Sequence, residues 1–170
     1  MKWKNHRLVS FALVFAGTGH LLPAFVAMRG STFPDQIEES FLSPTWAKNH
    51  RKGTHYWAYY MVPILLCAAS IGHFLLYLPK EVIVTKLTTE PQEFLIRLAV
   101  YLGMWFCIGA LLHVVEDFIC GKVPGLTIEQ RIGFHLFRVG TPQEYLWSYL
   151  IIASVIFSRF YSDVIFVYGL

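Results

Sequence analysis

Four long apolar stretches limit what this chain can fold into. Each is long enough to cross a lipid bilayer as a helix, which takes about 20 residues. They run over 8–28, 56–78, 94–119 and 142–167, in a 170-residue chain that is 55% hydrophobic. A soluble domain of this size could not bury that much apolar surface. The runs are continuous rather than alternating, which favours helices over a β-barrel.

The predicted fold class is therefore all-α, a single polytopic membrane domain over 1–170 built as a four-transmembrane-helix bundle. The N-terminus resembles a signal peptide, with Lys2, Lys4 and Arg7 before the first apolar run. That run is long for a signal, so we interpret it as a retained first span. The basic cluster predicts a cytoplasmic N-terminus in a multi-pass protein.

Four spans would put both termini on one side of the membrane and the first and third loops, 29–54 and 120–141, on the other. The motif-bearing loops would then share one membrane face. His73 follows His55 by about 18 residues, about 27 Å along a helix, and is excluded from that face. Arg159 and Asp163 are excluded for the same reason, and their spacing suggests a structural ion pair.

The third span ends with His113 and Asp117, which share one helix face at i and i+4. An ionisable pair on an apolar helix is costly unless it is compensated, which points to a functional site. Imidazole and carboxylate groups are ligands of zinc and related metals. The first loop adds Asp35, His50 and His55 on the expected motif face.

Several of these candidates keep a simpler alternative. His20, in Gly17-Thr-Gly-His20, is either a ligand reaching the site from below or a hydrogen-bonding residue at a helix interface. Asp35 could be a turn residue. Glu144 ends a Thr141-Pro-Gln-Glu144 capping box, so it is either a helix start or a carboxylate held at the site. Residues 126–137 are expected to form a short interfacial helix.

The remaining composition excludes some classes of function. Cys67, Cys107 and Cys120 form no CxxC pattern, so neither disulfides nor a thiolate zinc site is indicated. The net charge of +3 suits contact with anionic lipid headgroups, and no stretch resembles a nucleic-acid-binding patch.

The ordered motifs resemble the YdjM-like family of LexA-regulated, inner-membrane-associated, metal-dependent hydrolases. The matching pieces are Gly19-His20, Pro34-Asp35, His50-Arg-Lys-Gly-Thr-His55, His113-Val-Val-Glu-Asp117 and Phe137-Arg-Val-Gly-Thr141. The family is grouped with zinc-dependent phospholipase C. The chain departs from its pattern at Gly19, at the inserted Lys52, and after Asp35, where Gln36-Ile-Glu38 stands in place of a second aspartate.

The resemblance implies a bacterial inner-membrane hydrolase that binds one to three zinc ions, with manganese or iron as alternatives. The implied metal ligands are His20, Asp35, His50, His55, His113 and Asp117. A metal-activated water would attack a phosphoester of a membrane lipid or lipid-linked substrate, with Glu116 or Glu144 as the catalytic carboxylate. The competing hypotheses are a structural metal site in an accessory subunit of a larger membrane assembly and a metal-ion transporter. The expected partners, besides the lipid substrate, are a second copy of the chain or a membrane complex.

Overall fold

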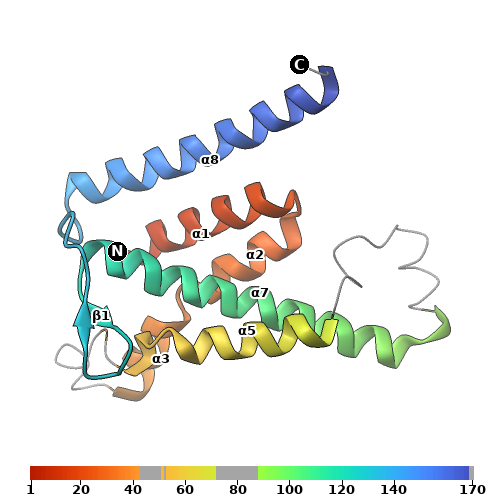
Figure 1. The fold of residues 1–170 in the computed structure, drawn as a ribbon, viewed down its shortest axis with the longest axis horizontal. Coiled ribbons are helices and arrows are strands. Elements are labelled where there is room, and N and C mark those ends of the chain that lie inside the picture. The colour runs from red at the N-terminus through yellow and green to blue at the C-terminus, as the bar shows by residue number, and fades with distance from the viewer. Residues whose placement is uncertain (43–50, 52, 72–87, 169–170) are drawn as a thin grey trace.

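The computed structural model describes residues 1–42, 51, 53–71 and 88–168, and helices make up most of them (Figure 1). The all-α prediction is confirmed. The helices are α1 (Trp3–Thr18), α2 (Leu21–Gly30), α3 (Phe33–Leu42), α5 (Ala58–Ile71), α7 (Pro91–Cys120) and α8 (Pro142–Tyr168). A 3₁₀ turn, η1 (Gly53–His55), precedes α5, and two short strands lie between α7 and α8.

The first apolar stretch is a helical hairpin and not the single span that we predicted over 8–28. Gly19 ends α1 in the left-handed conformation, with φ of 71°, and its N–H donates to the Phe15 carbonyl at 2.7 Å. Glycine adopts this conformation without a Cβ penalty, so the chain can reverse here. Helix α2 then returns along α1, which brings Asp35 in α3 close to the start of α1.

This reversal changes the expected positions of the termini. The N-terminus lies at the same end of the bundle as α3 and the end of α7, while the C-terminus lies at the opposite end (Figure 1). The expectation of both termini together, away from the motif-bearing loops, is wrong. Its cause is the turn at Gly19, which adds one chain reversal to the three that four spans require.

Helices α2 and α7 approach each other through a reciprocal pair of glycines. A Cβ on Gly109 would lie 1.9 Å from the Ala27 carbonyl oxygen, and one on Gly30 would lie 2.0 Å from the Phe106 carbonyl oxygen. Neither position has room for a side chain, because the obstacle is helix backbone. Small residues at crossing points allow this close contact. Ala24 and Ala27 are fully buried beside it.

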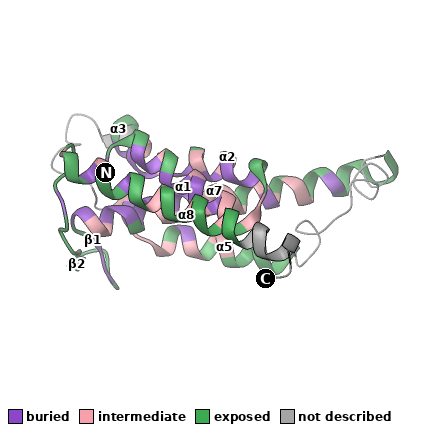
Figure 2. Cartoon of the chain, turned by 90° about the horizontal axis from the view of Figure 1, so that it is seen from above, coloured by how far each residue is buried: buried purple, intermediate pink, exposed green. Residues whose placement is uncertain are grey.

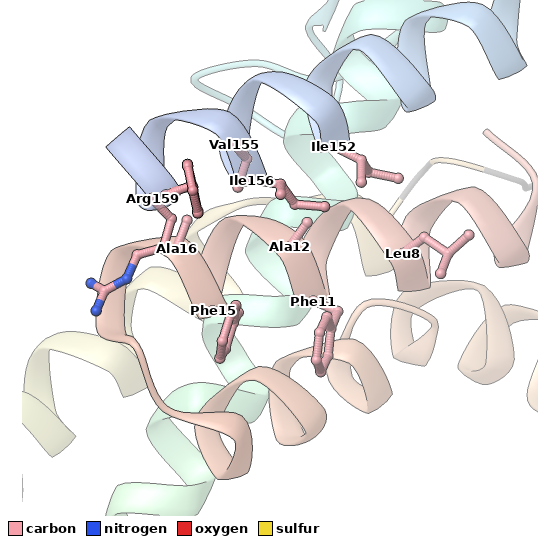
Figure 3. Close-up of a pocket in the computed structure, with 10 residues that line it drawn as sticks. Leu8, Phe11, Ala12, Phe15, Ala16, Ile152, Val155, Ile156 and Arg159 are labelled. Carbon is pink, nitrogen blue, oxygen red and sulfur yellow. The ribbon is translucent and has the colours of Figure 1, made fainter. Parts of the chain in front are cut away.

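Helix α8 packs along α1 and is otherwise largely exposed (Figure 2). Between the two helices lies an apolar groove of about 440 Å³, with Arg159 at one end (Figure 3). Leu8, Phe11 and Phe15 of α1 line one wall, and Ile152 and Ile156 of α8 line the other.

The segment after α7 forms a small β-hairpin. The prediction of an interfacial helix over 126–137 is therefore wrong. Strands β1 (Val123–Pro124) and β2 (Arg131–Ile132) pair antiparallel, with Val123 opposite Ile132. The Gln130 side chain accepts from the Leu126 N–H at 3.0 Å, which closes the turn. The Trp57 indole donates to the Gly125 carbonyl at 2.8 Å and ties the hairpin to α5.

The described helices do not support a four-span bundle. Among these residues, α7 is the helix whose length and apolarity suffice to cross a membrane, whereas the apolar part of α5, Ala58–Ser70, is shorter. Helix α2, with 10 residues, is about 15 Å long, half of the apolar thickness of a bilayer. The structure therefore confirms the helical class and replaces the first predicted span with a short hairpin.

Candidate metal centre

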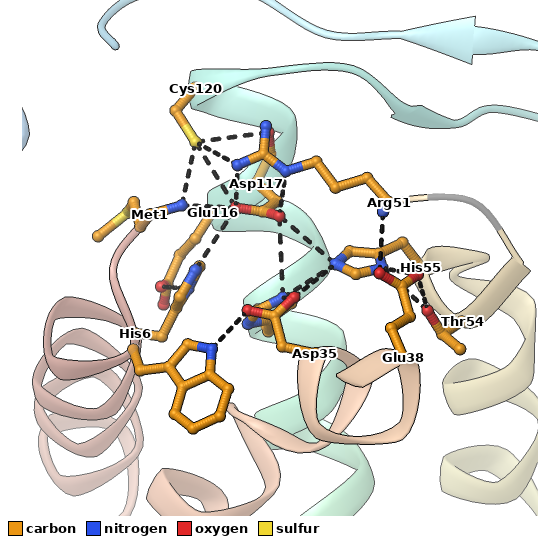
Figure 4. A network of polar contacts seen from close by, with 12 residues as sticks. Met1, His6, Asp35, Glu38, Arg51, Thr54, His55, Glu116, Asp117 and Cys120 are labelled. Carbon is orange, nitrogen blue, oxygen red and sulfur yellow. Dashed lines mark hydrogen bonds and ion pairs between the residues drawn. The ribbon is translucent and has the colours of Figure 1, made fainter. Parts of the chain in front are cut away.

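Four buried side chains bring one ligand atom each to a common point at the end of the bundle (Figure 4). Asp35 comes from α3, His55 from η1, and His113 and Asp117 from α7. All four ligand atoms lie within 4.8 Å of one another.

Five of their six separations are close to those of a tetrahedral metal site. His55 Nε2 lies 3.1 Å from His113 Nε2, and Asp35 Oδ1 lies 3.4 Å from each of these nitrogens. Asp117 Oδ2 lies 3.4 Å from His55 Nε2 and 3.8 Å from His113 Nε2. Ligands at zinc's usual bond lengths, placed at the corners of a tetrahedron, would stand about 3.3 Å apart. The donors present therefore fit a zinc-sized ion.

Helix geometry explains how distant segments supply these atoms. His113 and Asp117 are one turn apart on α7, as the i,i+4 spacing predicts. Asp35 stands in the first turn of α3, which begins three residues after the Gly30 contact with α7. The glycine crossing thus positions Asp35 opposite His113.

Glu38 orients His55. Its Oε1 lies 3.1 Å from His55 Nδ1 and also accepts a hydrogen bond from the Thr54 hydroxyl. Its Oε2 accepts from the Arg51 N–H at 3.1 Å. A carboxylate bonded to one ring nitrogen directs the other nitrogen toward a metal, which is the usual support for histidine ligands.

The contacts around Asp35 have the same effect. The Trp3 indole N–H donates to Oδ2 at 2.8 Å, leaving Oδ1 directed at the two histidines. Burial favours a neutral Asp35, but hydrogen bonds from His113 and His55 outweigh it and hold the pKa of the carboxyl well below its usual range. Burial favours a neutral His55, yet bonds to Asp117, Asp35 and Glu38 raise its pKa to about 10. The carboxylates thus favour a positive charge at this point.

Arg51 covers the outer side of the cluster. Its Nε lies 2.6 Å from Asp117 Oδ2, and its Nη2 lies 2.9 Å from Asp117 Oδ1. Its φ of 59° places a non-glycine residue in the left-handed region. Such a conformation costs about 1–3 kcal/mol and is found where surrounding contacts hold it, often at functional sites. The Arg51 N–H bond to Glu38 and the Arg131 bond to the Arg51 carbonyl supply those contacts.

A second layer lies on the α1 side. His6 Nδ1 pairs with Glu116 at 2.5 Å, and the Ser10 hydroxyl donates to the same carboxylate at 3.2 Å. The His6 ring lies against His113, with ring centroids 3.9 Å apart, and its Nε2 is 3.4 Å from Asp117 Oδ1. Glu116 therefore acts on the cluster through His6, because the helix turns its carboxylate away from the four ligand atoms.

Charge supports the same interpretation. Asp35, Glu38, Glu116 and Asp117 are all buried, and Glu116 is paired with His6. Arg51 and the Met1 amino group both pair with Asp117. Burying carboxylates is costly, so a divalent ion held by Asp35, His55, His113 and Asp117 would compensate negative charge at this point. The Met1 backbone nitrogen lies 2.6 Å from Asp117 Oδ1, on the side of that carboxylate away from the cluster.

The structure brings together four of the six predicted ligands: Asp35, His55, His113 and Asp117. His20 is not among them. It is exposed at the tip of the α1–α2 hairpin, because α1 carries it about 20 Å along the bundle from His6. His50 and His73 lie outside the described ranges, and so does the side chain of Asp163. The predictions for these three residues stay predictions.

Glu144 lies next to the cluster but does not enter it. It accepts from the Lys2 N–H at 2.6 Å, the Asn5 amide at 2.5 Å and the Gly140 N–H at 2.5 Å. Glu144 therefore has the role of a helix-start residue, the first of the two alternatives. The same carboxylate also holds the start of α8 against α1. These contacts occupy both oxygens with structural partners.

Sequence reasoning missed His6, Glu38, Arg51 and Cys120. His6 and Ser10 repeat the i,i+4 pattern of a polar pair before an apolar run, so His6 could have been found as His113 was. Glu38 lies one turn after Asp35, which places both on one face of α3. Arg51 and the Cys120 thiol, 3.6 Å from Asp117 Oδ1, carried no pattern that distinguishes them.

Comparisons with known protein families, with curated proteins and with solved structures found no match to this chain. The resemblance to the YdjM-like hydrolases therefore stays a prediction from the motifs.

Proposed function

We propose that this chain is a membrane-bound, metal-dependent hydrolase acting on a phosphoester. The observation that carries the proposal is the tetrahedral set Asp35, His55, His113 and Asp117, in which the five ligand separations given above lie between 3.1 and 3.8 Å. Two imidazoles and two carboxylates fit zinc best, with manganese or iron as alternatives.

A bound zinc would lower the pKa of a coordinated water and polarise the phosphoryl oxygen. The residues of the chain would then have separate tasks. The four ligands hold the ion, and Glu38 orients His55. His6 Nε2 lies 3.4 Å from Asp117 Oδ1, so His6 orients this ligand. Glu116 holds the His6 ring in that position.

Exposed apolar surface supports the proposed membrane location, and the motif resemblance adds the bacterial inner membrane to this proposal. Helix α7 is apolar enough to cross a bilayer, and many large apolar side chains are exposed along α5 and α8, such as Leu65, Leu66, Phe157 and Phe160. The metal ligands all lie at one end of this apolar body. A lipid or lipid-linked substrate would present its polar group at that depth.

Metal analysis of two histidine variants tests the proposal. Purified full-length protein is expected to hold about one equivalent of metal, and His113→Ala is expected to lose it together with phosphodiesterase activity. His20→Ala is the matched control, because it removes an exposed histidine at the far end of α1, and it should keep both. Equal metal content in all three proteins would refute the assignment of the site.

A structural metal site is the second candidate, because the protein supplies all four corners of the tetrahedron. Structural zinc sites are closed in this way, whereas catalytic sites keep an open position for water. Cobalt substitution separates the two. A d–d spectrum that changes on adding azide indicates an open position and supports the hydrolase. An unchanged spectrum, with no hydrolysis and a large loss of thermal stability on chelation, supports a structural role.

A further inference from the structure

A basic pocket lies directly beside the metal centre. It has a volume of about 650 Å³ and is formed by the end of α7, the β-hairpin and the segment that leads to α8. Its charged lining consists of Arg51, Lys122, Arg131, His135 and Arg138. Among the described residues that line it, none is acidic.

The positive charge of this pocket is poorly compensated. No carboxylate of a described residue forms an ion pair with Lys122, Arg131 or Arg138. Arg131 instead donates to the carbonyl oxygens of Arg51 and Lys122. Burial and the neighbouring Arg51 charge lower the pKa of Arg131, and the Glu38 carboxylate offsets only part of this effect.

Backbone contacts hold this arrangement. The Arg131 side chain connects β2 to the carbonyl oxygen of Arg51 and to that of Lys122, which precedes β1. His135 adopts a positive φ of 56°, and the Phe134 N–H donates to the Phe118 carbonyl at 2.9 Å. The loop that presents Arg138 is therefore fixed to the end of α7. The Arg131 guanidinium is thus held in place before an anion arrives, and the backbone that carries Arg138 is fixed beside it.

Arg51 and Cys120 connect the pocket to the metal centre. Both line the pocket, and both reach Asp117, with Arg51 Nε at 2.6 Å from Oδ2. An anion in the pocket would thus lie one side chain away from the ligand cluster. Guanidinium groups pair with phosphate oxygens through two parallel hydrogen bonds, and several cations around one group suit a doubly charged anion.

We propose that this pocket binds the phosphate group of the substrate, with Arg138, Lys122 and Arg131 as its ligands and Arg51 as the link to the metal. This inference rests on the proposed hydrolase function, but the binding of phosphate to the pocket can be measured without turnover. The volume exceeds that of a phosphate ion, which leaves room for the group that is esterified to it.

The test is equilibrium dialysis of the full-length chain in detergent against radiolabelled inorganic phosphate at low ionic strength. The double variant Lys122→Gln/Arg138→Gln removes two exposed cations whose side chains make no described hydrogen bond. We expect it to weaken phosphate binding about tenfold or more. The matched control, Lys4→Gln/Arg29→Gln, removes the same charge from exposed positions outside the pocket and should bind phosphate as the parent does.

Competition identifies the source of the phosphate. Short-chain phosphatidic acid that displaces phosphate at lower concentration than glycerol 3-phosphate would assign the pocket to a lipid headgroup, and equal potency would assign it to a soluble phosphate. Absence of saturable binding, or equal weakening in both double variants, would overturn the inference.

Metal content measured on the same samples separates this inference from the proposed function. Metal bound without pocket-dependent phosphate binding refutes the pocket alone. Pocket-dependent phosphate binding in a protein that holds no metal refutes the hydrolase and keeps the pocket.

Discussion

The two longest helices, α7 and α8, are similar in length but have opposite environments. Helix α7 has 30 residues and packs against α1, α2 and α5, whereas α8 has 27 residues and packs mainly against α1. The buried residues of α7 include His113, Glu116 and Asp117. In α8, Glu144 and Ser148 are the buried residues among those with described side chains.

The difference shows that packing, more than composition, determines where this chain can hold chemistry. Ionisable groups on α7 are surrounded by partners from α1, α3 and η1, so their charges are compensated. Among the described side chains of α8, the buried carboxylate of Glu144 is used to attach the helix, and large apolar side chains such as Phe157 and Phe160 are exposed. Helix α7 supplies two of the four ligands, whereas α8 lies next to the site through Glu144.

The strongest test of this contrast is Gly109→Leu in α7. The new side chain would begin 1.9 Å from the Ala27 carbonyl oxygen, so α2 and α7 must separate. Overpacking costs about 1–3 kcal/mol, and this backbone clash should reach the upper end of that range. Separation also moves Asp35 away from His113, so metal binding should be lost. Thermal unfolding in detergent and metal analysis measure the two effects.

Gly103→Leu is the matched control on the same helix, because nothing lies within 4 Å of its Cβ position. It should keep the metal and be neutral or slightly stabilised, since glycine costs a helix about 1 kcal/mol relative to alanine. Equal destabilisation by both substitutions would mean that the glycine crossing does not position the site.

An intermediate effect is expected for Glu38→Gln, which tests whether α7 depends on α3 for its chemistry. The amide keeps the size of the side chain but binds His55 Nδ1 less strongly. Loss of such a supporting carboxylate typically lowers metal affinity about 10–100-fold. Competition with a chromogenic chelator measures the affinity. Glu39→Gln, at an exposed neighbouring position, should leave it unchanged, and equal affinity in all three proteins would show that Glu38 does not orient His55.

The smallest effect is expected for Glu144→Gln, which weakens the attachment of α8. The amide retains one acceptor for Lys2, Asn5 and Gly140 but loses the charge that strengthens those bonds. The expected loss is about 1 kcal/mol of unfolding free energy, with metal content unchanged. Glu129→Gln, at an exposed site in the hairpin turn, should change stability by less than about 0.5 kcal/mol. Loss of metal in Glu144→Gln would instead place α8 among the elements that build the site.

The ligands on regular helix could be predicted, because their signal is local. The i,i+4 spacing on an apolar helix predicts His113 and Asp117. Asp35 and His55 follow from their positions in the first loop, which was expected at the same membrane face. The helical class follows from the apolar runs in the same way. The i,i+4 pair and the apolar runs need only neighbouring residues, whereas the placement of Asp35 and His55 beside that pair rested on the predicted loop topology.

The errors come from places where one backbone conformation changes the path of the chain. Gly19 turns a predicted span into a hairpin, and this single residue moves His20 to the far end and brings His6 to the site. The β-hairpin after α7 was missed because its two strands are only two residues each, too short to show alternation. Arg51 enters the site through a left-handed conformation that its residue type does not indicate.

The reciprocal contact of Gly30 and Gly109 has a consequence for how this protein could evolve. The spacing between Asp35 and His113 depends on two residues that touch no metal and no substrate. A larger residue at one position would have to be accepted together with a shifted ligand spacing. In relatives that retain the four ligands, we expect both positions to stay small, whereas lineages that lost the site should be free to vary them.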